Sequence, residues 1–294
     1  MAVFRQLTTY IEEQLSKALK LNIRLKDISP VSGGSINQAY CLHTSEGDYM
    51  MKVNSKSAFP DMFAREADGL ATIRETQTIA VPEVVLQADI EDESFLILEW
   101  IESVSATPVS SKLLGQQLAD MHRHTSPQFG LEYHNYMGSI PQSNRRHDTW
   151  AMFFINERLQ PMVKIAVDKG LLNRTDAQQF EKLFLNISGL FNEEPPALIH
   201  GDLWGGNYLI SRQGEPYLID PAVSYGHREF DIAMTNLFGG FGSDFYHHYN
   251  ESFPLTKGWQ QRINLWNLYP LLLHLNLFGT SYLAQVKSCL AEYI

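Results

Sequence analysis

The sequence predicts an α+β fold with two lobes, a small sheet-rich lobe over residues 1–101 and a larger, mainly helical lobe over residues 102–294. Short apolar runs separated by polar turns dominate the first part of the chain, and this pattern is typical of strands. Long segments with apolar residues at helical spacing dominate the rest. Between them, residues 103–110 are rich in Ser, Thr and Pro, which is typical of a hinge or linker.

The small lobe is predicted to be an antiparallel sheet with one key helix. An amphipathic helix over residues 1–21 comes first, because its apolar residues recur at helical spacing. The key helix covers residues 61–75. The predicted strands are residues 38–43, 49–53, 84–88 and 95–100. The turn between the first two strands, Ser45-Glu46-Gly47-Asp48, is a hairpin signal.

The large lobe is predicted to combine long helices with one strand-rich block. The helices cover residues 112–124, 150–169, 175–191, 229–238 and 258–285. Pro161 predicts a kink in the second of these helices, because proline cannot donate the helical hydrogen bond. The strand-rich block has short strands at residues 197–201, 208–211 and 217–220.

Composition narrows the range of functions. The net charge of −10 argues against binding to nucleic-acid phosphates, which needs clustered Lys and Arg. The two cysteines, Cys41 and Cys289, form no CxxC pair, so neither a disulfide framework nor a zinc site is predicted. The apolar stretch 265–278 is too short and too polar to span a bilayer. We therefore expect a cytoplasmic protein with no nucleic-acid and no membrane partner, and its oligomeric state stays open.

The strongest chemical signal is the segment His200-Gly201-Asp202-Leu203-Trp204-Gly205-Gly206-Asn207. A short apolar strand leads into it, and Asn207 stands five residues after Asp202. A second aspartate, Asp220, ends another short apolar strand. The tripeptide alone is typical of a turn, but the added offsets favour a catalytic site.

Phosphoryl transfer explains each of these residue types. Catalysis of this reaction consists mainly of positioning and charge neutralisation. Asp202 would orient an acceptor hydroxyl and take its proton as the catalytic base. Asn207 and Asp220 would supply oxygen ligands to Mg²⁺, a hard cation that prefers oxygen. The glycines Gly205 and Gly206 would let the loop turn tightly.

Upstream residues complete a predicted ATP site. The predicted nucleotide-binding residues are Gly33, Gly34, Ser35, Lys52, Glu66, Glu99, Trp100 and Ile101. The Gly-Gly segment lies between two strand candidates, where backbone N–H groups could cover phosphates. Lys52 is aimed at phosphates from a strand, and Glu66 on the following helix is placed to hold it by an ion pair. Glu99 to Ile101 end the last strand, where main-chain groups could bind adenine.

The order of these features resembles the protein-kinase superfamily over roughly the whole chain. The sequence departs from true protein kinases in that Asp220-Pro221-Ala222 replaces Asp-Phe-Gly and only ten residues separate Asp220 from Asp231. This gap leaves no room for an activation segment and points to a small-molecule acceptor. The expected fold is therefore the bilobal protein-kinase-like fold, with ATP and Mg²⁺ as cofactors.

Longer strings resemble the fructosamine/ketosamine kinase family. They are the 200–207 segment, residues 219–222, residues 225–234, residues 237–241 and residues 138–144 with Trp150. The resemblance implies phosphorylation of the C3 hydroxyl of ketosamines, namely fructosamine, ribulosamine or erythrulosamine adducts on amines or protein lysines. It implies a role in protein repair by deglycation, with a small-molecule ketosamine or a glycated protein lysine as partner.

Further residues are predicted to support or line the site. The carboxylate of Asp231, at the start of a helix, is expected to accept backbone N–H bonds from the loop at residues 200–202. His200 is expected to brace the loop. Candidates for the substrate pocket are Trp204, Trp150, Tyr225 and His227. For Trp204, core packing is an equal alternative.

Two other functions stay open at this point. An aminoglycoside or choline kinase of the same fold would share Asp202, Asn207 and Asp220 and differ in its acceptor pocket. A pseudokinase would bind nucleotide without chemistry, but such proteins usually lack a phosphate or metal ligand, and here Lys52 and Glu66 are present as well.

Overall fold

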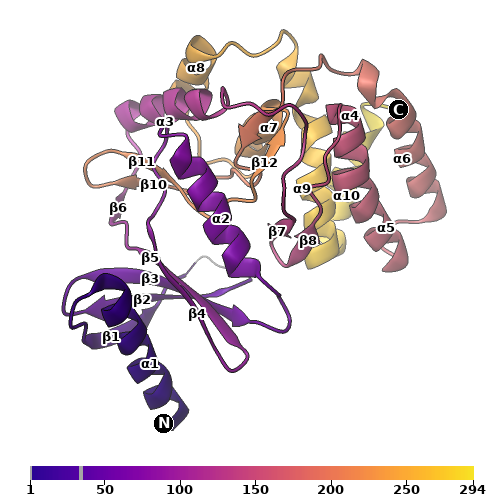
Figure 1. The fold of residues 1–294 in the computed structure, drawn as a ribbon. Coiled ribbons are helices and arrows are strands. Elements are labelled where there is room, and N and C mark those ends of the chain that lie inside the picture. Colours follow the sequence, from indigo (N-terminus) through magenta and orange to yellow (C-terminus); the bar gives the residue numbers. More distant parts are fainter. Residues whose placement is uncertain (1, 33–35) are drawn as a thin grey trace. The chain divides into compact units, whose positions relative to one another are not determined.

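The computed structural model describes residues 2–32 and 36–294 and divides the chain into two compact units (Figure 1). The first unit comprises Met1–Ser105 and Leu209–Asp220, and the second comprises Ala106–Tyr208 and Pro221–Ile294. The sequence placed the division after residue 101 and assigned the 208–220 hairpin to the helical lobe. The hairpin belongs to the first unit because its strand β10 (Tyr208–Ser211) pairs with β6 (Ser103–Val104), with Ile210 opposite Val104.

The first unit is built on a five-stranded antiparallel sheet with the strand order β1-β2-β3-β5-β4. The strands are β1 (Leu25–Pro30), β2 (Gln38–Thr44), β3 (Asp48–Ser55), β4 (Val84–Ile90) and β5 (Glu93–Glu99). Four of them confirm the predicted strands to within a few residues. A separate three-stranded sheet joins β11 (Pro216–Leu218), β10 and β6.

Helix α1 (Ala2–Leu19) covers one face of the five-stranded sheet. Its residues Ile11 and Leu15 are buried in one cluster with Leu42, Met51 and Ile97 of the strands. Because side chains alternate along a strand, Cys41 and Lys52 lie on the opposite face. Helix α2 (Met62–Glu75) contacts β4 and β5 and carries Glu66.

The second unit is mainly helical. Its α-helices are α3 (Pro108–Met121), α4 (Trp150–Phe153), α5 (Gln160–Asp168), α6 (Arg174–Asn186), α7 (Glu229–Leu237), α8 (Ser243–Ser252), α9 (Ile263–Phe278) and α10 (Leu283–Ala291). Two short strand pairs complete it: β7 (Asn135–Met137) with β8 (Ile140–Gln142), and β9 (Ala197–Ile199) with β12 (Ser224–Gly226). Short 3₁₀ segments lie at Ile187–Gly189, Trp259–Arg262 and Thr280–Tyr282.

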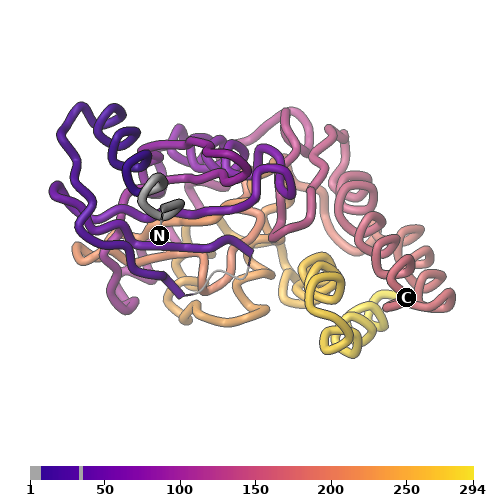
Figure 2. The backbone as a smooth tube through the Cα atoms, turned by 90° about the horizontal axis from the view of Figure 1, so that it is seen from below, coloured from indigo at the N-terminus to yellow at the C-terminus, as the bar shows by residue number. Residues whose placement is uncertain are grey.

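Two predicted helices take a different form. Between α4 and α5, residues Phe154–Leu159 form a π-helix that leads into Pro161 in the first turn of α5. A wider turn accommodates the missing proline donor, and this change of helix type lies at the position where Pro161 predicts a kink. The predicted helix 258–285 is divided at Gly279, whose φ of 88° ends α9 before α10 begins. Figure 2 shows α9 and α10 side by side.

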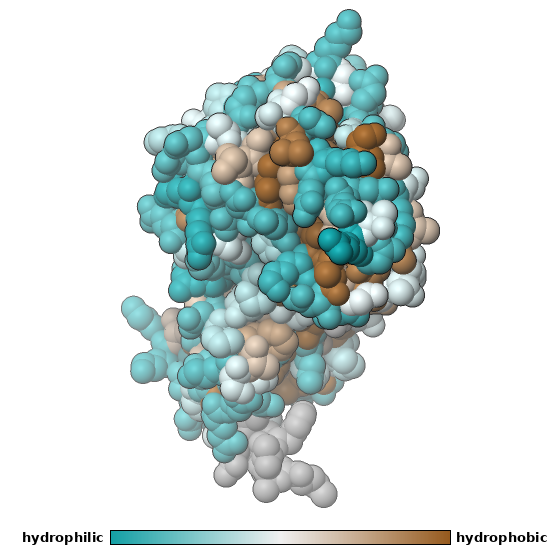
Figure 3. All heavy atoms as spheres, turned by 90° about the vertical axis from the view of Figure 1, so that its right-hand side faces the viewer, coloured by the Kyte–Doolittle hydropathy of each residue, from teal (hydrophilic) through white to brown (hydrophobic). Residues whose placement is uncertain are grey.

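The core of the second unit is aromatic. Trp150, Phe154, Phe230 and Trp266 are fully buried, with neighbouring rings in stacked or edge-to-face contact. The molecular face on which α6 and α10 lie is mostly hydrophilic, with hydrophobic side chains in small separate groups (Figure 3). Within the described residues, no helix combines the length and apolar character that a membrane crossing requires.

Candidate active site

In the first unit, a lysine and two carboxylates make up one part of the predicted active site. Lys52 on β3 donates from Nζ to Glu66 Oε1 of α2 at 2.5 Å and also to Asp220 Oδ1. The ion pair between Lys52 and Glu66 that the sequence predicts is therefore confirmed. The Lys52 and Glu66 side chains are buried, whereas that of Asp220 is 43% exposed. Asp220 thus presents a carboxylate to solvent while Lys52 is held in place.

The charge state of this group follows from its burial and its partners. Burial alone would lower the pKa of Lys52, but the nearby charges of Asp220 and Glu66 outweigh it and raise the pKa above the ordinary lysine value. Burial, together with the charge of Asp220, raises the pKa of Glu66, although Lys52 acts in the opposite direction. The ammonium of Lys52 therefore stays cationic at neutral pH.

The backbone of Asp220 is held in the left-handed region, with a φ of 55°. This conformation is uncommon for a residue with a Cβ and costs of order 1 kcal/mol, and such strain is concentrated at functional sites. It turns the chain sharply between β11 and Pro221. The sequence signalled the aspartate but not this turn.

In the second unit, the loop after β9 makes up the other part of the predicted active site. Asp231 Oδ2 accepts a hydrogen bond from the backbone N–H of His200 at 2.7 Å, and Oδ1 accepts from that of Gly201 at 2.9 Å. Asp231 is fully buried at the start of α7. The hydrogen bonds predicted from its position in the sequence are therefore present, and a buried carboxylate fixes the loop that carries Asp202.

Within the loop, Asp202 is tied to Asn207. The Asn207 amide donates from Nδ2 to the main-chain oxygen of Asp202 at 2.8 Å and to its carboxylate Oδ2 at 2.9 Å. The Asp202 N–H donates to His200 Nδ1 at 3.2 Å, so His200 braces the loop as predicted. Because both amide hydrogens of Asn207 face Asp202, its Oδ1 is the atom left to serve as a ligand.

Two residues that sequence reasoning missed lie behind Asp231. His122, the C-cap residue that follows α3, contacts Asp231 Oδ2 through Nε2 at 3.1 Å, and its Nδ1 lies 2.7 Å from the hydroxyl of Tyr249 on α8. All three side chains are buried. Burial raises the pKa of the Tyr249 phenol, so the phenol stays protonated and donates to Nδ1. His122 then carries its proton on Nε2 and donates to Asp231.

The glycines of the loop are required for space. At Gly201, whose φ is 82°, an added Cβ would lie 2.2 Å from the Ala222 carbonyl oxygen. At Gly205 it would lie 2.7 Å from the Gly239 carbonyl oxygen. Gly205 and Gly206 are the central residues of the predicted tight turn, in which the Asn207 N–H donates to the Trp204 carbonyl oxygen at 2.9 Å, although neither glycine adopts a positive φ. Close backbone approach explains why two Gly-Gly pairs, 205–206 and 239–240, occur in this unit.

The four predicted substrate residues separate into two groups. Trp150 and His227 are only 1% exposed and pack among core aromatics, so the prediction that they line a substrate pocket was wrong. Burial lowers the pKa of His227, whose Nε2–H donates to the Asn192 carbonyl at 3.1 Å. Trp204 and Tyr225 are half-buried and keep an exposed edge. The Trp204 ring packs against Gly206 and edge-on to Phe238.

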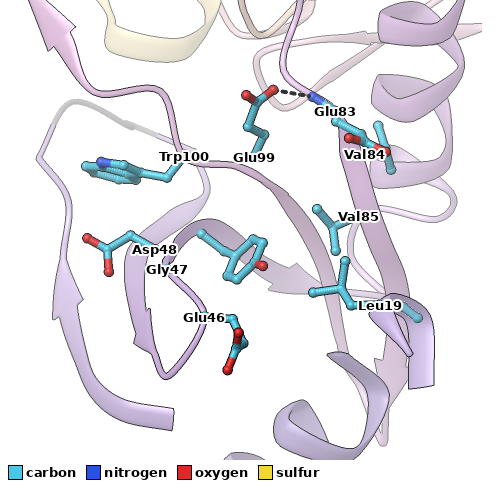
Figure 4. Close-up of a pocket in the computed structure, with 11 residues that line it drawn as sticks. Leu19, Glu46, Gly47, Asp48, Glu83, Val84, Val85, Glu99 and Trp100 are labelled. Atoms are coloured by element: carbon cyan, nitrogen blue, oxygen red, sulfur yellow. Dashed lines mark hydrogen bonds between the residues drawn. The ribbon is translucent and has the colours of Figure 1, made fainter. Parts of the chain in front are cut away.

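The structure describes only some of the other predicted nucleotide-binding residues. Gly33, Gly34 and Ser35 lie outside the described residues. Glu99 Oε2 accepts from the Glu83 N–H at 3.2 Å (Figure 4), and Trp100 and Ile101 follow it with half-buried side chains.

A pocket of about 330 Å³ lies beside Glu99 and Trp100, and Ala18, Leu19 and Tyr49 also line it (Figure 4). Tyr49 packs against the cluster beneath α1. Since Lys52 lies on the other face of the sheet, this pocket is not the predicted ATP site.

The sequence profile described as fructosamine kinase matches residues 7–294. The chain belongs to the fructosamine kinase family.

Named relatives agree with this membership. A protein of Enterococcus faecium named as a probable ketoamine kinase is 39% identical over 282 residues, which cover 94% of this chain and 97% of that protein. The chloroplastic protein-ribulosamine 3-kinase of Arabidopsis thaliana is 36% identical, over 92% of this chain and 83% of that protein.

Solved structures identify the fold. A candidate fructosamine-3-kinase from Thermobifida fusca superposes with a TM-score of 0.86 at 31% identity, over 96% of this chain and 98% of the other. The aminoglycoside phosphotransferase APH(4)-Ia, at 16% identity over 97% of this chain and 99% of the other, superposes with a TM-score of 0.63 and shares the fold alone. The chain has the protein-kinase-like fold that the sequence predicts, and this fructosamine kinase family member is an ATP-dependent phosphotransferase.

Proposed function

We propose that this family member phosphorylates the C3 hydroxyl of ketosamines, with Asp202 as the catalytic base. The observation that carries the proposal is the Asp202–Asn207 pair on a loop whose backbone is fixed by buried Asp231. A carboxylate held in this way meets the main requirement of phosphoryl transfer, which is positioning. The ketosamine substrate class is supported by the names of the family and of its relatives.

The roles of the chain's own residues follow from their contacts. Asp202 orients the acceptor hydroxyl and accepts its proton as the hydroxyl oxygen forms a bond to the γ-phosphorus of ATP. The bond between that phosphorus and the bridging oxygen breaks, and ADP leaves. Lys52, kept cationic and rigid by Glu66, binds phosphate oxygens. Gly33, Gly34, Ser35, Glu99, Trp100 and Ile101 are proposed as further nucleotide-binding residues.

Asn207 and Asp220 fit a magnesium site by their donor atoms. Asn207 presents an amide oxygen because its N–H groups are bound to Asp202, and Asp220 presents a half-exposed carboxylate. Both are the oxygen donors that Mg²⁺ prefers. When bound, the ion neutralises charge on the phosphates. Trp204 and Tyr225 are proposed to line the acceptor pocket, because their rings remain partly exposed.

The implied consequence is deglycation, in which the phosphorylated adduct leaves the amine of a free compound or of a protein lysine. An aminoglycoside or choline acceptor is the alternative that this fold permits, and the fold alone does not decide between them.

A phosphorylation assay read by mass spectrometry tests the proposal. Purified protein with Mg²⁺ and ATP is given ribulosyl-lysine, fructosyl-lysine, an aminoglycoside and choline in separate reactions. We expect phosphate on a ketosamine, and we expect Asp202→Asn to lower kcat by about 10²–10⁴ while ATP still binds. Asp168→Asn is the matched control, since Asp168 is an exposed partner of Lys164 on α5.

Each other outcome has a distinct meaning. Phosphate on the aminoglycoside or choline alone would remove the ketosamine proposal and keep the mechanism. Near-normal turnover by Asp202→Asn would remove the proposed base. Binding of ATP without transfer to any acceptor would identify a pseudokinase.

A further inference from the structure

Three potential metal ligands meet at the hairpin formed by β2 and β3. His43 Nδ1 lies 3.8 Å from Cys41 Sγ and 3.0 Å from Asp48 Oδ1. All three ligand atoms lie within 4.8 Å of one another. No zinc site was predicted from the sequence because its cysteines form no CxxC pair, but the sheet brings these ligands together from two strands.

The strand pairing explains why the three side chains converge. Cys41 and His43 are two residues apart on β2 and therefore share one face of the sheet. Asp48, the first residue of β3, lies opposite His43 in the register of the pair. This arrangement belongs to the sheet itself and does not depend on a loop conformation.

The spacing matches that of a tetrahedral site. Ligand atoms bonded to zinc at about 2.0–2.3 Å lie about 3.3–3.6 Å apart when the geometry is tetrahedral. The two separations from His43 Nδ1, 3.0 and 3.8 Å, bracket this range, and the Cys41 sulfur lies within 4.8 Å of the Asp48 carboxylate, so small side-chain movements would seat an ion. The side chains of His43 and Asp48 are 37% and 41% exposed, which leaves a path for an ion from solvent.

The histidine is already oriented by a neighbour on β1. His43 Nε2 lies 3.0 Å from the Ser29 hydroxyl, and Ser29 pairs with Cys41 in the sheet. Without a metal, Nδ1–H donates to the Asp48 carboxylate and Nε2 accepts from Ser29. When metal binding moves the ring proton to Nε2, Nε2–H donates to Ser29 and the lone pair of Nδ1 faces Cys41 and Asp48. Metal-binding histidines nearly always have a partner of this kind on the other ring nitrogen.

Two other groups of potential metal ligands among the described residues are less suited to bind an ion. In the group Glu194, His227 and Glu229, the carboxylates are already bound to Arg228 and Arg262. The group His247, His248 and Glu251 lies on one face of α8, and the side chains of His247 and Glu251 are 66% and 60% exposed. Of these three groups, the hairpin group alone includes sulfur, and its Cys41 is buried.

We propose that Cys41, His43 and Asp48 form a binding site for Zn²⁺ or a similar borderline divalent cation, with the fourth position taken by water. As the Zn–S bond forms, the Cys41 thiol gives its proton to solvent and the sulfur binds as thiolate. The bound ion cross-links β2 to β3 at the hairpin end, on the sheet face that also carries Lys52. This site is separate from the proposed magnesium ligands and does not rest on the proposed function.

Cobalt substitution tests the site through its sulfur ligand. Full-length protein is freed of metal with a chelator and titrated with Co²⁺ in the absence of nucleotide, and then with Zn²⁺. We expect a sulfur-to-cobalt charge-transfer absorption at one equivalent, displaced by one equivalent of Zn²⁺. Oxygen ligands such as Asn207 and Asp220 cannot produce this absorption, so the two sites are distinguished by spectrum.

Variants assign the ligands. Cys41→Ser should remove the sulfur band, and Asp48→Asn, at the exposed hairpin end, should weaken Zn²⁺ binding while circular dichroism stays unchanged. Ser29→Ala should weaken Zn²⁺ binding about tenfold, because it frees the histidine ring to turn. Cys289→Ser and His248→Ala are controls and should bind as wild type does. A missing sulfur band in the wild-type protein, or a band that survives Cys41→Ser, would overturn the proposal.

Discussion

Lys52 and Asp202 are held in place by opposite means. Lys52 is fixed by side-chain charges, Glu66 and Asp220, which contact its ammonium directly. Asp202 is held through its backbone, because Asp231 binds the N–H groups of the two residues before it, while the Asp202 carboxylate accepts from Asn207. The contacts of Lys52 are made to the charged group itself, whereas Asp231 acts on the loop that carries Asp202. The two regions should therefore respond differently when one partner is removed.

The largest effect is expected at Asp231. Asp231→Ala removes the acceptor of two buried backbone N–H groups and of His122 Nε2–H, and should lower the free energy of unfolding by about 3–5 kcal/mol. Urea denaturation measures this loss, and Asp168→Ala should change the unfolding free energy by less than about 0.5 kcal/mol. A loss in Asp231→Ala no larger than that of the control would show that the loop keeps its shape without the carboxylate.

Removal of the Lys52 ion pairs should lower the free energy of unfolding by less than Asp231→Ala does, and by an amount that depends on pH. Lys52→Met removes the cation and leaves Glu66 buried without its partner, which should cost about 2–3 kcal/mol at neutral pH. Burial raises the pKa of Glu66, so the folded variant holds its proton to higher pH than the unfolded chain does. Lys52→Met should therefore be most stable below pH 4.5, and its free energy of unfolding should fall as the pH rises through the pKa of Glu66 in the folded state.

The pH dependence itself is the check on this assignment. Urea titrations of Lys52→Met between pH 4 and pH 8 should show falling stability, whereas Lys52→Met/Glu66→Gln should show a flatter profile. In the wild type the raised pKa of Lys52 contributes stability that is fully present below its unfolded value of 10.5, so Lys52 adds no slope in this range. Equal slopes in the two variants would exclude Glu66 as the titrating group.

A substitution where Gly205 lies against Gly239 and Gly240 should cause an intermediate loss of unfolding free energy. Gly205→Ala places a Cβ 2.7 Å from the Gly239 carbonyl oxygen and 3.0 Å from Gly240 Cα, so backbone must move. We expect a loss of about 1–3 kcal/mol in unfolding free energy, together with a lower kcat. Gly189→Ala is the matched control, because nothing lies within 4 Å of its added Cβ. Equal stability of the two variants would mean that the loops separate without cost.

The sequence predicted those parts of the molecule that depend on local pattern. The predicted strands of the five-stranded sheet and the ion pair of Lys52 with Glu66 followed from periodicity and motif order, and the structure confirms them. Asp231 was predicted to bind the loop from the family resemblance and from its place in the motif order. The π-helix before Pro161 was not predicted, because several backbone geometries can accommodate a proline.

Contacts between distant segments explain the rest of the differences. Trp150 looked like a pocket residue, but whether a tryptophan faces a core or a cleft depends on elements far along the chain. His122 was missed since it stands 109 residues before Asp231 on an otherwise ordinary amphipathic helix. The hairpin cluster of Cys41, His43 and Asp48 likewise depends on strand register, which spacing rules for metal motifs do not include.

The smallest effect is expected at the far end of the buried chain of hydrogen bonds. Tyr249→Phe removes only the hydroxyl that donates to His122, and Asp231 keeps both of its backbone partners. We expect a loss of about 1 kcal/mol in unfolding free energy and nearly unchanged kcat. Urea denaturation and steady-state kinetics of Tyr249→Phe measure the two quantities. A fall in kcat as large as that of Asp231→Ala would contradict this expectation. The position of the loop would then depend on the hydrogen bonds from Tyr249 through His122 as well as on the backbone bonds of Asp231.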